Sequence, residues 1–161
     1  MRLDASKTEP LVMGLPDDPG DARAIRSAME GQWASWNAGH AVRDADFAPD
    51  CDYVTFDGTE LHGIEENRRL HDAFGKGVLR GSRLSGRVRR IRFITPGVAV
   101  VHSTGNLQLR FHRRPKPNRE SVQTTMMRKT ADGWRIEAFQ NTRIRRYGPL
   151  ARLAVWLAGK L

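Results

Sequence analysis

Residues 87–110 read RVRRIRFITPGVAVVHSTGNLQLR, which contains two runs of strand-forming residues on either side of the turn sequence Thr95-Pro96-Gly97. β-Branched and aromatic residues favour strands, whereas proline and glycine favour turns. We therefore predict strands over about 82–94 and 97–110. The connection has the length of a hairpin, so the two strands should pair antiparallel.

The pattern repeats toward the C-terminus. Residues 120–130 and 133–143 form two further runs, and Ala131-Asp132-Gly133 lies between them. Residues Arg113–Asn118 connect the two pairs of strands. We therefore expect four long strands in one antiparallel sheet.

The first of these strands contains an irregularity. Leu84 and Val88 share one parity, whereas Ile91 and Phe93 share the other. A β-bulge near Arg89-Arg90 would bring both pairs to the same face and would bend the strand. Such bending is expected to curl the sheet around a pocket.

Three helices and a strand are predicted before these strands. The first helix should begin near Asp21, a residue that suits a helix N-cap, and end near Gly39. A second, short helix is expected at Val42–Phe47 and a third at about Ile64–Gly75. Residues Asp52–Phe56 are rich in strand formers and predict a strand between them.

The chain has 161 residues, which suits one domain with a hydrophobic core. Residues 1–20 are rich in proline and glycine without periodicity, so we expect a flexible arm. Residues 21–146 should form the domain. Residues 147–161 predict an amphipathic, basic helix at its C-terminal end.

The composition argues against several classes of protein. The formal net charge is +9, but neither zinc-finger spacing nor an aromatic-rich RNA-binding motif accompanies it, so we expect no nucleic-acid partner. Cys51 is the single cysteine, which excludes an intrachain disulfide and favours a cytoplasmic location. No apolar run approaches the ~20 residues that span a bilayer.

Short motifs spread over about residues 20–145 accompany this order of elements. They are Trp33-Ala-Ser-Trp-Asn-Ala-Gly39, Asp52-Tyr-Val-Thr-Phe-Asp-Gly58, His71 followed by Phe74, Gly81-Ser-Arg-Leu84, Val98-Ala-Val-Val-His102, Glu120-Ser-Val-Gln-Thr124 and Trp134-Arg-Ile-Glu-Ala-Phe-Gln-Asn-Thr-Arg143. The order and the motifs resemble the nuclear-transport-factor-2-like superfamily, and most closely the SgcJ/EcaC group of SnoaL-like proteins.

The resemblance implies an α+β fold in which a cone-shaped, curved antiparallel sheet packs against three N-terminal helices, with the C-terminal helix as an addition. It also implies a pocket for a hydrophobic small molecule. Relatives include polyketide cyclases, ketosteroid isomerases, dehydratases and proteins without catalysis, and members of this branch often belong to natural-product pathways. We therefore expect a cofactor-free cyclase, isomerase or dehydratase, or else a non-catalytic module that binds a hydrophobic ligand or dimerises.

Two histidines are the candidate catalytic residues. His71 shares a face of the third predicted helix with Asn67, a candidate ligand-binding residue, and that face should point into the pocket. His102 interrupts the apolar run Val98–Val101 and is expected to face either the pocket or a dimer contact. An imidazole exchanges a proton near neutral pH, so the two rings would share acid–base work. The plainer alternative for His71 is a core-edge side chain held by one hydrogen bond.

Amide side chains near the ends of the late strands are candidates for holding a ligand carbonyl. They are Gln123, Gln140 and Asn141. Gln140 and Asn141 are neighbours, so they cannot both face the cavity in a regular strand. The alternative is that these amides bind neighbouring loops.

Aromatic residues are candidates for the pocket wall. Trp33, Tyr53 and Phe56 would supply it, and the hydroxyl of Tyr53 could donate to a developing oxyanion. Core packing is the alternative for Trp33. The late strands offer no convincing buried carboxylate, so an aspartate-based isomerase mechanism is not expected.

Nothing in the sequence predicts a cofactor or a metal site. It contains no glycine-rich nucleotide motif, and its histidines lack metal-ligand spacing. We expect a homodimer through the convex face of the sheet, with Val122, Thr124 and Met126 pointing outward. The helix within residues 147–161 could pad the sheet or a dimer, lie on an anionic membrane surface, or bind a partner protein, and the membrane alternative is not favoured.

Overall fold

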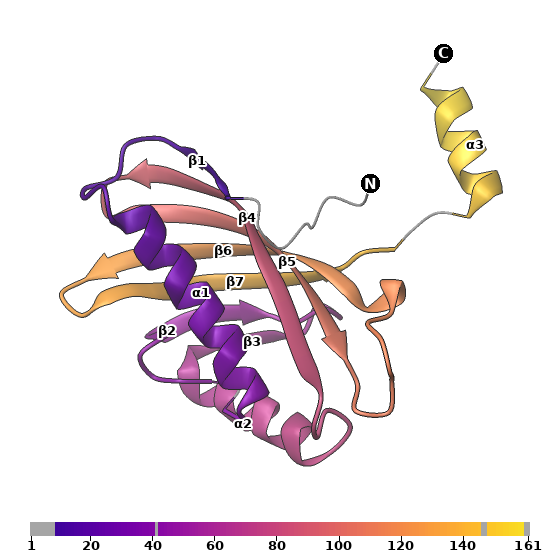
Figure 1. The fold of residues 1–161 in the computed structure, drawn as a ribbon, viewed down its shortest axis with the longest axis horizontal. Coiled ribbons are helices and arrows are strands. Elements are labelled where there is room, and N and C mark those ends of the chain that lie inside the picture. The colour runs from indigo at the N-terminus through magenta and orange to yellow at the C-terminus, as the bar shows by residue number, and fades with distance from the viewer. Residues whose placement is uncertain (1–8, 41, 146–147, 160–161) are drawn as a thin grey trace.

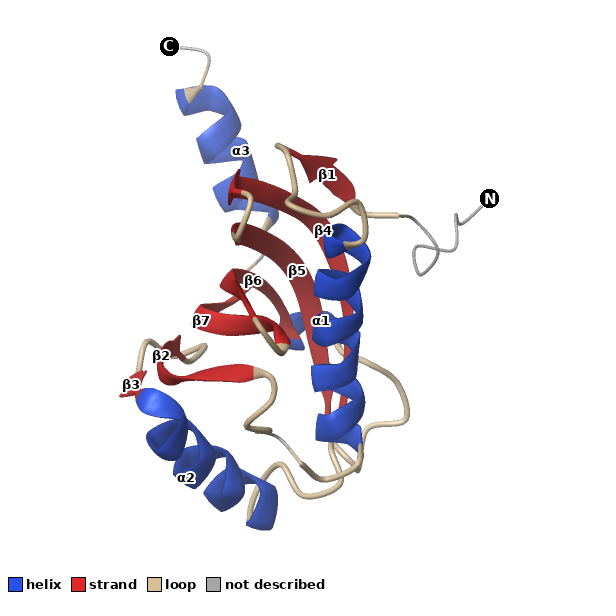
Figure 2. Ribbon diagram, turned by 90° about the vertical axis from the view of Figure 1, so that its left-hand side faces the viewer, coloured by secondary structure: helices blue, strands red, loops and turns tan. Residues whose placement is uncertain are grey.

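The computed structural model describes residues 9–40, 42–145 and 148–159, and this part of the chain contains one mixed sheet of seven strands. Across the sheet, the strands are β1 (Leu11–Met13), β4 (Arg83–Thr95), β5 (Val98–Gln108), β6 (Glu120–Thr130), β7 (Gly133–Arg143), β2 (Phe47–Val54) and β3 (Glu60–His62). Two helices, α1 (Asp21–Asn37) and α2 (Gly63–Lys76), lie on one side of the curved sheet (Figure 1, Figure 2). The α+β class is therefore confirmed, although the sheet is not closed.

The four long strands form where the sequence predicts them. β4, β5, β6 and β7 pair in order, and each neighbouring pair is antiparallel. Alternating burial along β5 and β6 turns one face of these strands toward the helices and the other outward. This alternation decides which side chains reach the interior.

The edges of the sheet differ from the prediction. β2 pairs with β7 and β1 pairs with β4, and both pairs are parallel. The prediction of a wholly antiparallel sheet is therefore wrong. β1 lies within the predicted flexible arm, of which residues 1–8 fall outside the described residues. A strand of three residues is too short to produce the periodicity that reveals longer strands.

The short helix predicted at Val42–Phe47 is wrong. Residues 44–46 form a turn, and β2 begins at Phe47. The register of β2 on β7 shifts between Phe47 and Asp52, and Pro49 lies within this irregular stretch, where its missing N–H does not interrupt a regular ladder. The first predicted helix forms as α1 and the second does not form, so the described residues before β4 contain two helices rather than three.

Two bulges change which side chains face inward. The pairing of β4 shifts between Val88 and Arg90, which confirms the predicted bulge. In β7, Ala138 pairs with Met126 whereas Ile136 pairs with Met127, so Glu137 is an extra residue that sequence reasoning missed. A bulge bends its strand and reverses the parity beyond it.

The hydrophobic core lies between α1 and the sheet. Ile25, Met29 and Trp33 of α1 are buried against inward side chains of the sheet. Among these inward side chains, Ile91 and Val101 are both 0% exposed. Burying a side chain of this size contributes about 1.5–3 kcal/mol relative to leaving it in water. The helical spacing of these apolar residues therefore fixes α1 on the sheet.

The third helix, α3 (Pro149–Ala158), stands away from the sheet (Figure 1). Leu150, Val155 and Leu157 are 84%, 59% and 52% exposed, so α3 does not pad the sheet of its own chain. Residues 146–147 and 160–161 of the predicted C-terminal segment fall outside the described residues.

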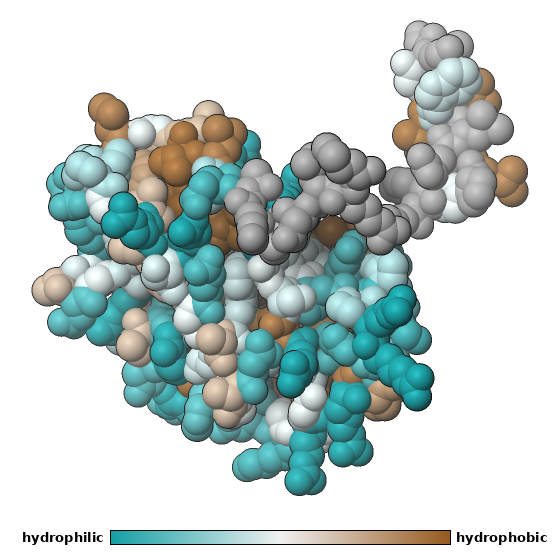
Figure 3. Space-filling model, viewed as in Figure 1, coloured by the Kyte–Doolittle hydropathy of each residue, from teal (hydrophilic) through white to brown (hydrophobic). Residues whose placement is uncertain are grey.

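Exposed apolar side chains gather over β1, which includes Met13 (Figure 3). Within the described ranges, no helix combines the length and the apolar character needed to cross a membrane.

Candidate active site

A cavity of about 350 Å³ lies between the two helices and the sheet. This volume is in the range of sites that hold small organic molecules. Its lining comes from α1, α2 and the loop that follows it, the end of β2 and its turn, and the facing strands: Gln32, Trp33, Trp36, Tyr53, Thr55, Phe56, His71, Phe74, Val78, Leu79, Leu84, Leu107, Arg119, Ser121, Gln123, Phe139, Asn141 and Arg143. Most of these side chains are apolar.

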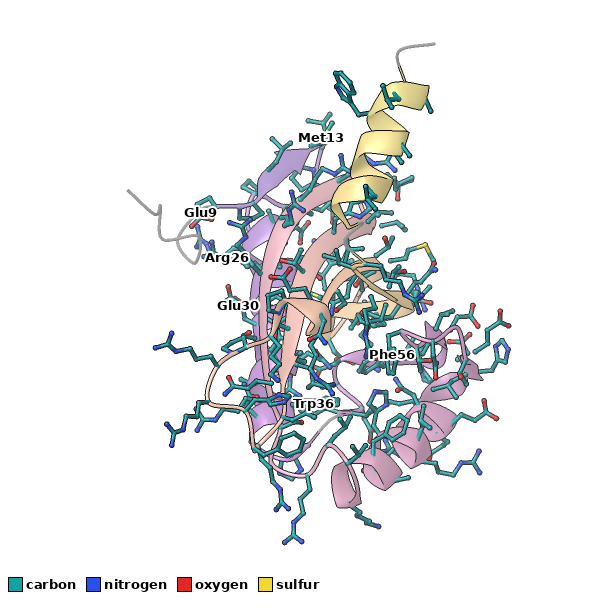
Figure 4. The ribbon with its side chains drawn as sticks, turned by 90° about the vertical axis from the view of Figure 1, so that its right-hand side faces the viewer. Glu9, Met13, Arg26, Glu30, Trp36 and Phe56 are labelled. Carbon is teal, nitrogen blue, oxygen red and sulfur yellow. The ribbon has the colours of Figure 1, made fainter. Side chains whose placement is uncertain are left out.

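Aromatic side chains make much of the wall. Trp36 on α1 and Phe56 after β2 lie between the long strands and α2 (Figure 4). Trp33 lines the cavity and is also part of the core, with 7% of its surface exposed. Tyr53 stacks on Phe139 with ring centroids 4.6 Å apart. The three aromatic residues predicted for the wall, Trp33, Tyr53 and Phe56, therefore all reach the cavity.

His71 lines the cavity with only 8% of its surface exposed. Its Nδ1 lies 2.8 Å from the backbone oxygen of Asn67, so Nδ1–H donates and the other ring nitrogen, Nε2, carries the lone pair. The ring meets Trp36 and Tyr53 edge to face, with centroid distances of 5.7 and 5.2 Å. Burial lowers the pKa of His71 below its ordinary value, although the hydrogen bond to Asn67 and the charge of Asp72 oppose this effect. His71 is therefore a neutral base at pH 7.

Tyr53 supplies a phenol beside this imidazole. Burial raises the pKa of Tyr53 far above its usual range, so the hydroxyl stays protonated and remains a donor. Its ring is held between His71 and Phe139. A rigid donor beside a neutral base is an arrangement that can act on a ligand oxygen and a neighbouring proton.

Gln123 lies at the floor of the cavity with 4% of its surface exposed. The hydroxyl of Ser103 donates to its Oε1 at 2.8 Å, and its Nε2 lies 3.4 Å from the hydroxyl of Ser121. A Cβ at Gly105 would lie 2.7 Å from this Nε2, so glycine leaves the space that the amide occupies. Gln123 is thus held by both serines, with one N–H of its Nε2 directed at Ser121.

The bulge at Glu137 decides between the two amides of β7. Beyond it, Phe139, Asn141 and Arg143 line the cavity, whereas Gln140 is exposed on the other face. Asn141 pairs with Gln123 across the ladder, and its Oδ1 is buried with no partner among the described residues. Placing Gln140 in the site is therefore wrong, because its predicted parity ignored the extra residue.

His102 does not reach the cavity. Ala99, Val101 and Ser103 of β5 are the inward residues, so His102 points outward, with its Nδ1 3.4 Å from the hydroxyl of Thr124. Partial burial and the charges of Arg90 and Arg92 lower the pKa of His102. The predicted sharing of acid–base work between His71 and His102 is consequently wrong.

Asn67 is fully buried but does not line the cavity. Both polar atoms of its side chain lack a partner among the described residues. Its backbone oxygen, rather than its amide, contributes to the site by fixing the tautomer of His71. Direct ligand binding by Asn67 is therefore not supported.

Sequence reasoning missed the two arginines of the lining. Arg119 precedes β6, and Arg143 ends β7 with its guanidinium carbon 4.2 Å from the centroid of the Phe56 ring. Arg119 directly precedes the predicted strand 120–130, in which Ser121 and Gln123 share one parity, so its place beside the inward residues could have been noticed. The described residues contain no group of histidine, cysteine and acidic side chains that could hold a metal ion.

Solved structures with a cystatin-like or NTF2-like fold resemble the chain. A domain of unknown function with a cystatin-like fold from Nostoc punctiforme is 26% identical, with a TM-score of 0.73, and the match covers 89% of this chain and 88% of that one. An NTF-2-like protein of unknown function from Shewanella oneidensis is 17% identical, with a TM-score of 0.62 and coverage of 74% and 97%. A ketosteroid isomerase-like protein from Erwinia carotovora is 12% identical, with a TM-score of 0.60 and coverage of 80% and 99%.

These likenesses identify the fold as nuclear-transport-factor-2-like. No protein-family model matches the chain, and no curated protein matches it in sequence.

Proposed function

We propose that the protein binds an apolar small molecule in the cavity and that His71 acts there as a cofactor-free general base. Within the nuclear-transport-factor-2-like superfamily, the motifs quoted above favour the SgcJ/EcaC branch of SnoaL-like proteins, with a role in secondary metabolism. The reaction class is that of a cyclase, isomerase or dehydratase. A buried, free Cys51 suits a reducing, cytoplasmic setting.

One observation carries this proposal. The hydrogen bond from Nδ1–H of His71 to Asn67 leaves the lone pair of Nε2 for a ligand, and the ring borders a mostly apolar cavity. General-base catalysis by a positioned group contributes about 10²–10⁴-fold in rate. His71 is thus the group that removes a proton from a carbon or hydroxyl of the ligand.

The neighbouring donors complete the site. Removing a proton next to a carbonyl places negative charge on the carbonyl oxygen, and an N–H or O–H directed at that oxygen stabilises the charge. Tyr53 offers the hydroxyl of the ring that contacts His71, and Gln123 offers the amide N–H that is not directed at Ser121. These two residues would hold the enolate oxygen while His71 holds the proton.

The alternative is a binding protein without catalysis, and one observation favours it. No aspartate or glutamate occurs in the cavity lining, so His71 is the single lining group that titrates near neutral pH. An apolar cavity with one neutral imidazole can also serve only to hold a hydrophobic metabolite. The two functions differ in whether a bound ketone exchanges protons with solvent.

Proton exchange on α-tetralone, an apolar bicyclic ketone, separates the alternatives. The protein is incubated with the ketone in deuterated water, and NMR follows deuterium incorporation next to the carbonyl. We expect the wild-type chain to accelerate exchange and the His71→Gln variant to lose the acceleration. Binding without acceleration in the wild type would reject catalysis and leave the binding function.

The matched control is His102→Gln, which removes an imidazole from the outer face of β5. It should leave the exchange rate unchanged. Equal loss in both variants would show that neither effect arises in the cavity.

A homodimer through the convex face is also proposed. Val122 and Met126 are 36% and 42% exposed on the outer face of β6, on either side of Thr124. Apolar side chains in the middle of an exposed sheet face suit a self-complementary contact. Light scattering should give twice the mass of one chain, and a Val122→Glu, Met126→Glu variant should give one; a wild-type monomer would reject the dimer.

A further inference from the structure

Arg119 and Arg143 border the cavity beside Ser121. We propose that these two arginines bind the carboxylate of the ligand, so that the cavity prefers apolar carboxylic acids to neutral molecules of the same shape. The inference rests on the ligand-binding function proposed above and names the class of ligand for that site.

The backbone brings the two arginines to one place. Arg143 lies directly opposite Ser121 in the β6–β7 ladder, and Arg119 precedes Ser121 by two residues. Arg119 ends the 3₁₀ helix Pro117–Arg119 directly before β6, and both arginines line the same cavity. Their long guanidinium side chains can therefore reach one carboxylate.

Neither arginine has an acidic partner in the described part of the chain. The ion pairs there involve other cations, such as Arg128 with Glu137, and the cavity lining contains no acidic side chain. Arg143 instead lies over the ring of Phe56, which orients the guanidinium without neutralising it. Both arginines are only partly exposed, so a bound anion is screened less than at an open surface.

The lining changes in character along β7. Arg143 lies at one end, Asn141 follows, and Phe139 comes next, stacked on Tyr53 beside His71. The four steps along the strand from Phe139 to Arg143 span about 13 Å. A ligand with its carboxylate at the arginines would lay an apolar body of one or two fused rings against Phe139 and reach toward His71.

Calorimetry with two matched probes tests the inference. 2-Naphthoate carries a carboxylate, and 2-naphthamide has nearly the same shape without the charge. The wild-type chain should bind the naphthoate at least about tenfold more tightly, the factor expected from one partly buried charge-assisted hydrogen bond. Arg119→Gln and Arg143→Gln should each remove much of this preference and leave naphthamide binding unchanged, whereas Arg143→Lys should keep part of it.

Arg114→Gln is the charge-matched control, because Arg114 is exposed in the loop between β5 and β6. It should keep the preference for naphthoate. Loss of the preference in this control, or equal binding of the two probes by the wild type, would overturn the carboxylate assignment and leave the ligand-binding function standing. If the wild type binds neither probe, the ligand-binding function fails, and this inference fails with it.

Discussion

The imidazole of His71 meets the ring of Tyr53 edge to face at 5.2 Å, and the same imidazole donates its Nδ1–H to the backbone oxygen of Asn67 at 2.8 Å. The ring is therefore fixed by its own helix on one side and by β2 on the other. Its burial has a consequence for stability as well as for chemistry.

Stability should fall on acidification because of His71. Burial lowers the pKa of His71 below its ordinary value of 6.5, so the unfolded chain binds this proton more readily than the folded chain. The stabilising contribution is fully present above pH 6.5 and is lost progressively as the pH falls below it. Urea unfolding at pH 7.5 and pH 5.5 should show a smaller difference in unfolding free energy for His71→Gln than for wild type.

His40→Gln, at an exposed position, should keep the wild-type difference. An unchanged difference in His71→Gln would contradict the burial of a neutral imidazole.

Gly86 should be intolerant of a methyl group. A Cβ at Gly86 would lie 2.5 Å from Cζ2 of Trp33, whereas a Cβ at Gly97 would meet nothing within 4 Å. Overpacking of this kind typically costs about 1–3 kcal/mol. Gly86→Ala should lower the unfolding free energy by this amount and displace the Trp33 wall of the cavity, and Gly97→Ala should not. Equal stability of the two variants by chemical denaturation would refute this packing.

Asp21 should be the more important of two acidic partners of Lys129. Trp134 Nε1 donates to Asp21 at 3.0 Å, and Lys129 Nζ lies 3.1 Å from both Asp21 and Asp17. The side chain of Asp21 is 6% exposed and that of Asp17 is 62% exposed. Asp21→Ala leaves a buried donor unpaired and should cost about 1–3 kcal/mol, whereas Asp17→Ala removes only a surface pair and should cost less than about 1 kcal/mol.

The pH dependence of this contact provides a second check. Burial tends to raise the pKa of Asp21, but hydrogen bonds from Trp134, the backbone of Asp18 and Lys129 lower it below 3.8. The contribution of ionised Asp21 to the unfolding free energy is present above pH 3.8 and is lost as the pH falls below that value. The stability difference between wild type and Asp21→Ala should therefore shrink on acidification; a constant difference would argue against an ionised Asp21 in this contact.

Removing α3 should leave the domain intact. Leu150, at the start of α3, is 84% exposed, and the helix stands away from the sheet (Figure 1). A chain ending at Arg145 should keep the unfolding temperature and the cavity binding of the full chain. A large loss of stability would show that α3 packs on the domain. If the full chain sediments with phosphatidylglycerol vesicles and the truncated chain does not, α3 binds membrane surfaces.

The long elements were predictable from sequence because each carries a long run of strand formers or a repeated burial pattern. β5 and β6 alternate along their length, β4 and β7 are long runs of strand formers interrupted by shifts in register, and α1 repeats apolar residues at helical spacing. The short edge strands β1 and β3 have three residues each, too few to show alternation, and β1 pairs with β4 far along the chain. Such pairing leaves no local signal.

The candidate site was predictable only in part, and one extra residue explains much of the difference. His71, Gln123 and Tyr53 reach the cavity as their patterns suggested. Because of the bulge at Glu137, Asn141 lines the cavity and Gln140 faces outward, the opposite of the predicted order. A one-residue insertion turns every side chain beyond it to the other face of the sheet. Bulges depend on the curvature of the whole sheet, so strand alternation alone does not locate them.

Fluorescence titration with N-phenyl-1-naphthylamine, an apolar probe that brightens in apolar surroundings, tests the central claim most directly. Leu107 lines the cavity, and the Leu107→Trp variant should fill the space without removing any polar group of the site. We predict saturable binding of one probe per wild-type chain and its loss in Leu107→Trp, with both proteins equally folded by circular dichroism. Absence of saturable binding in the wild type, or equal binding in the filled variant, would contradict a ligand cavity beside His71.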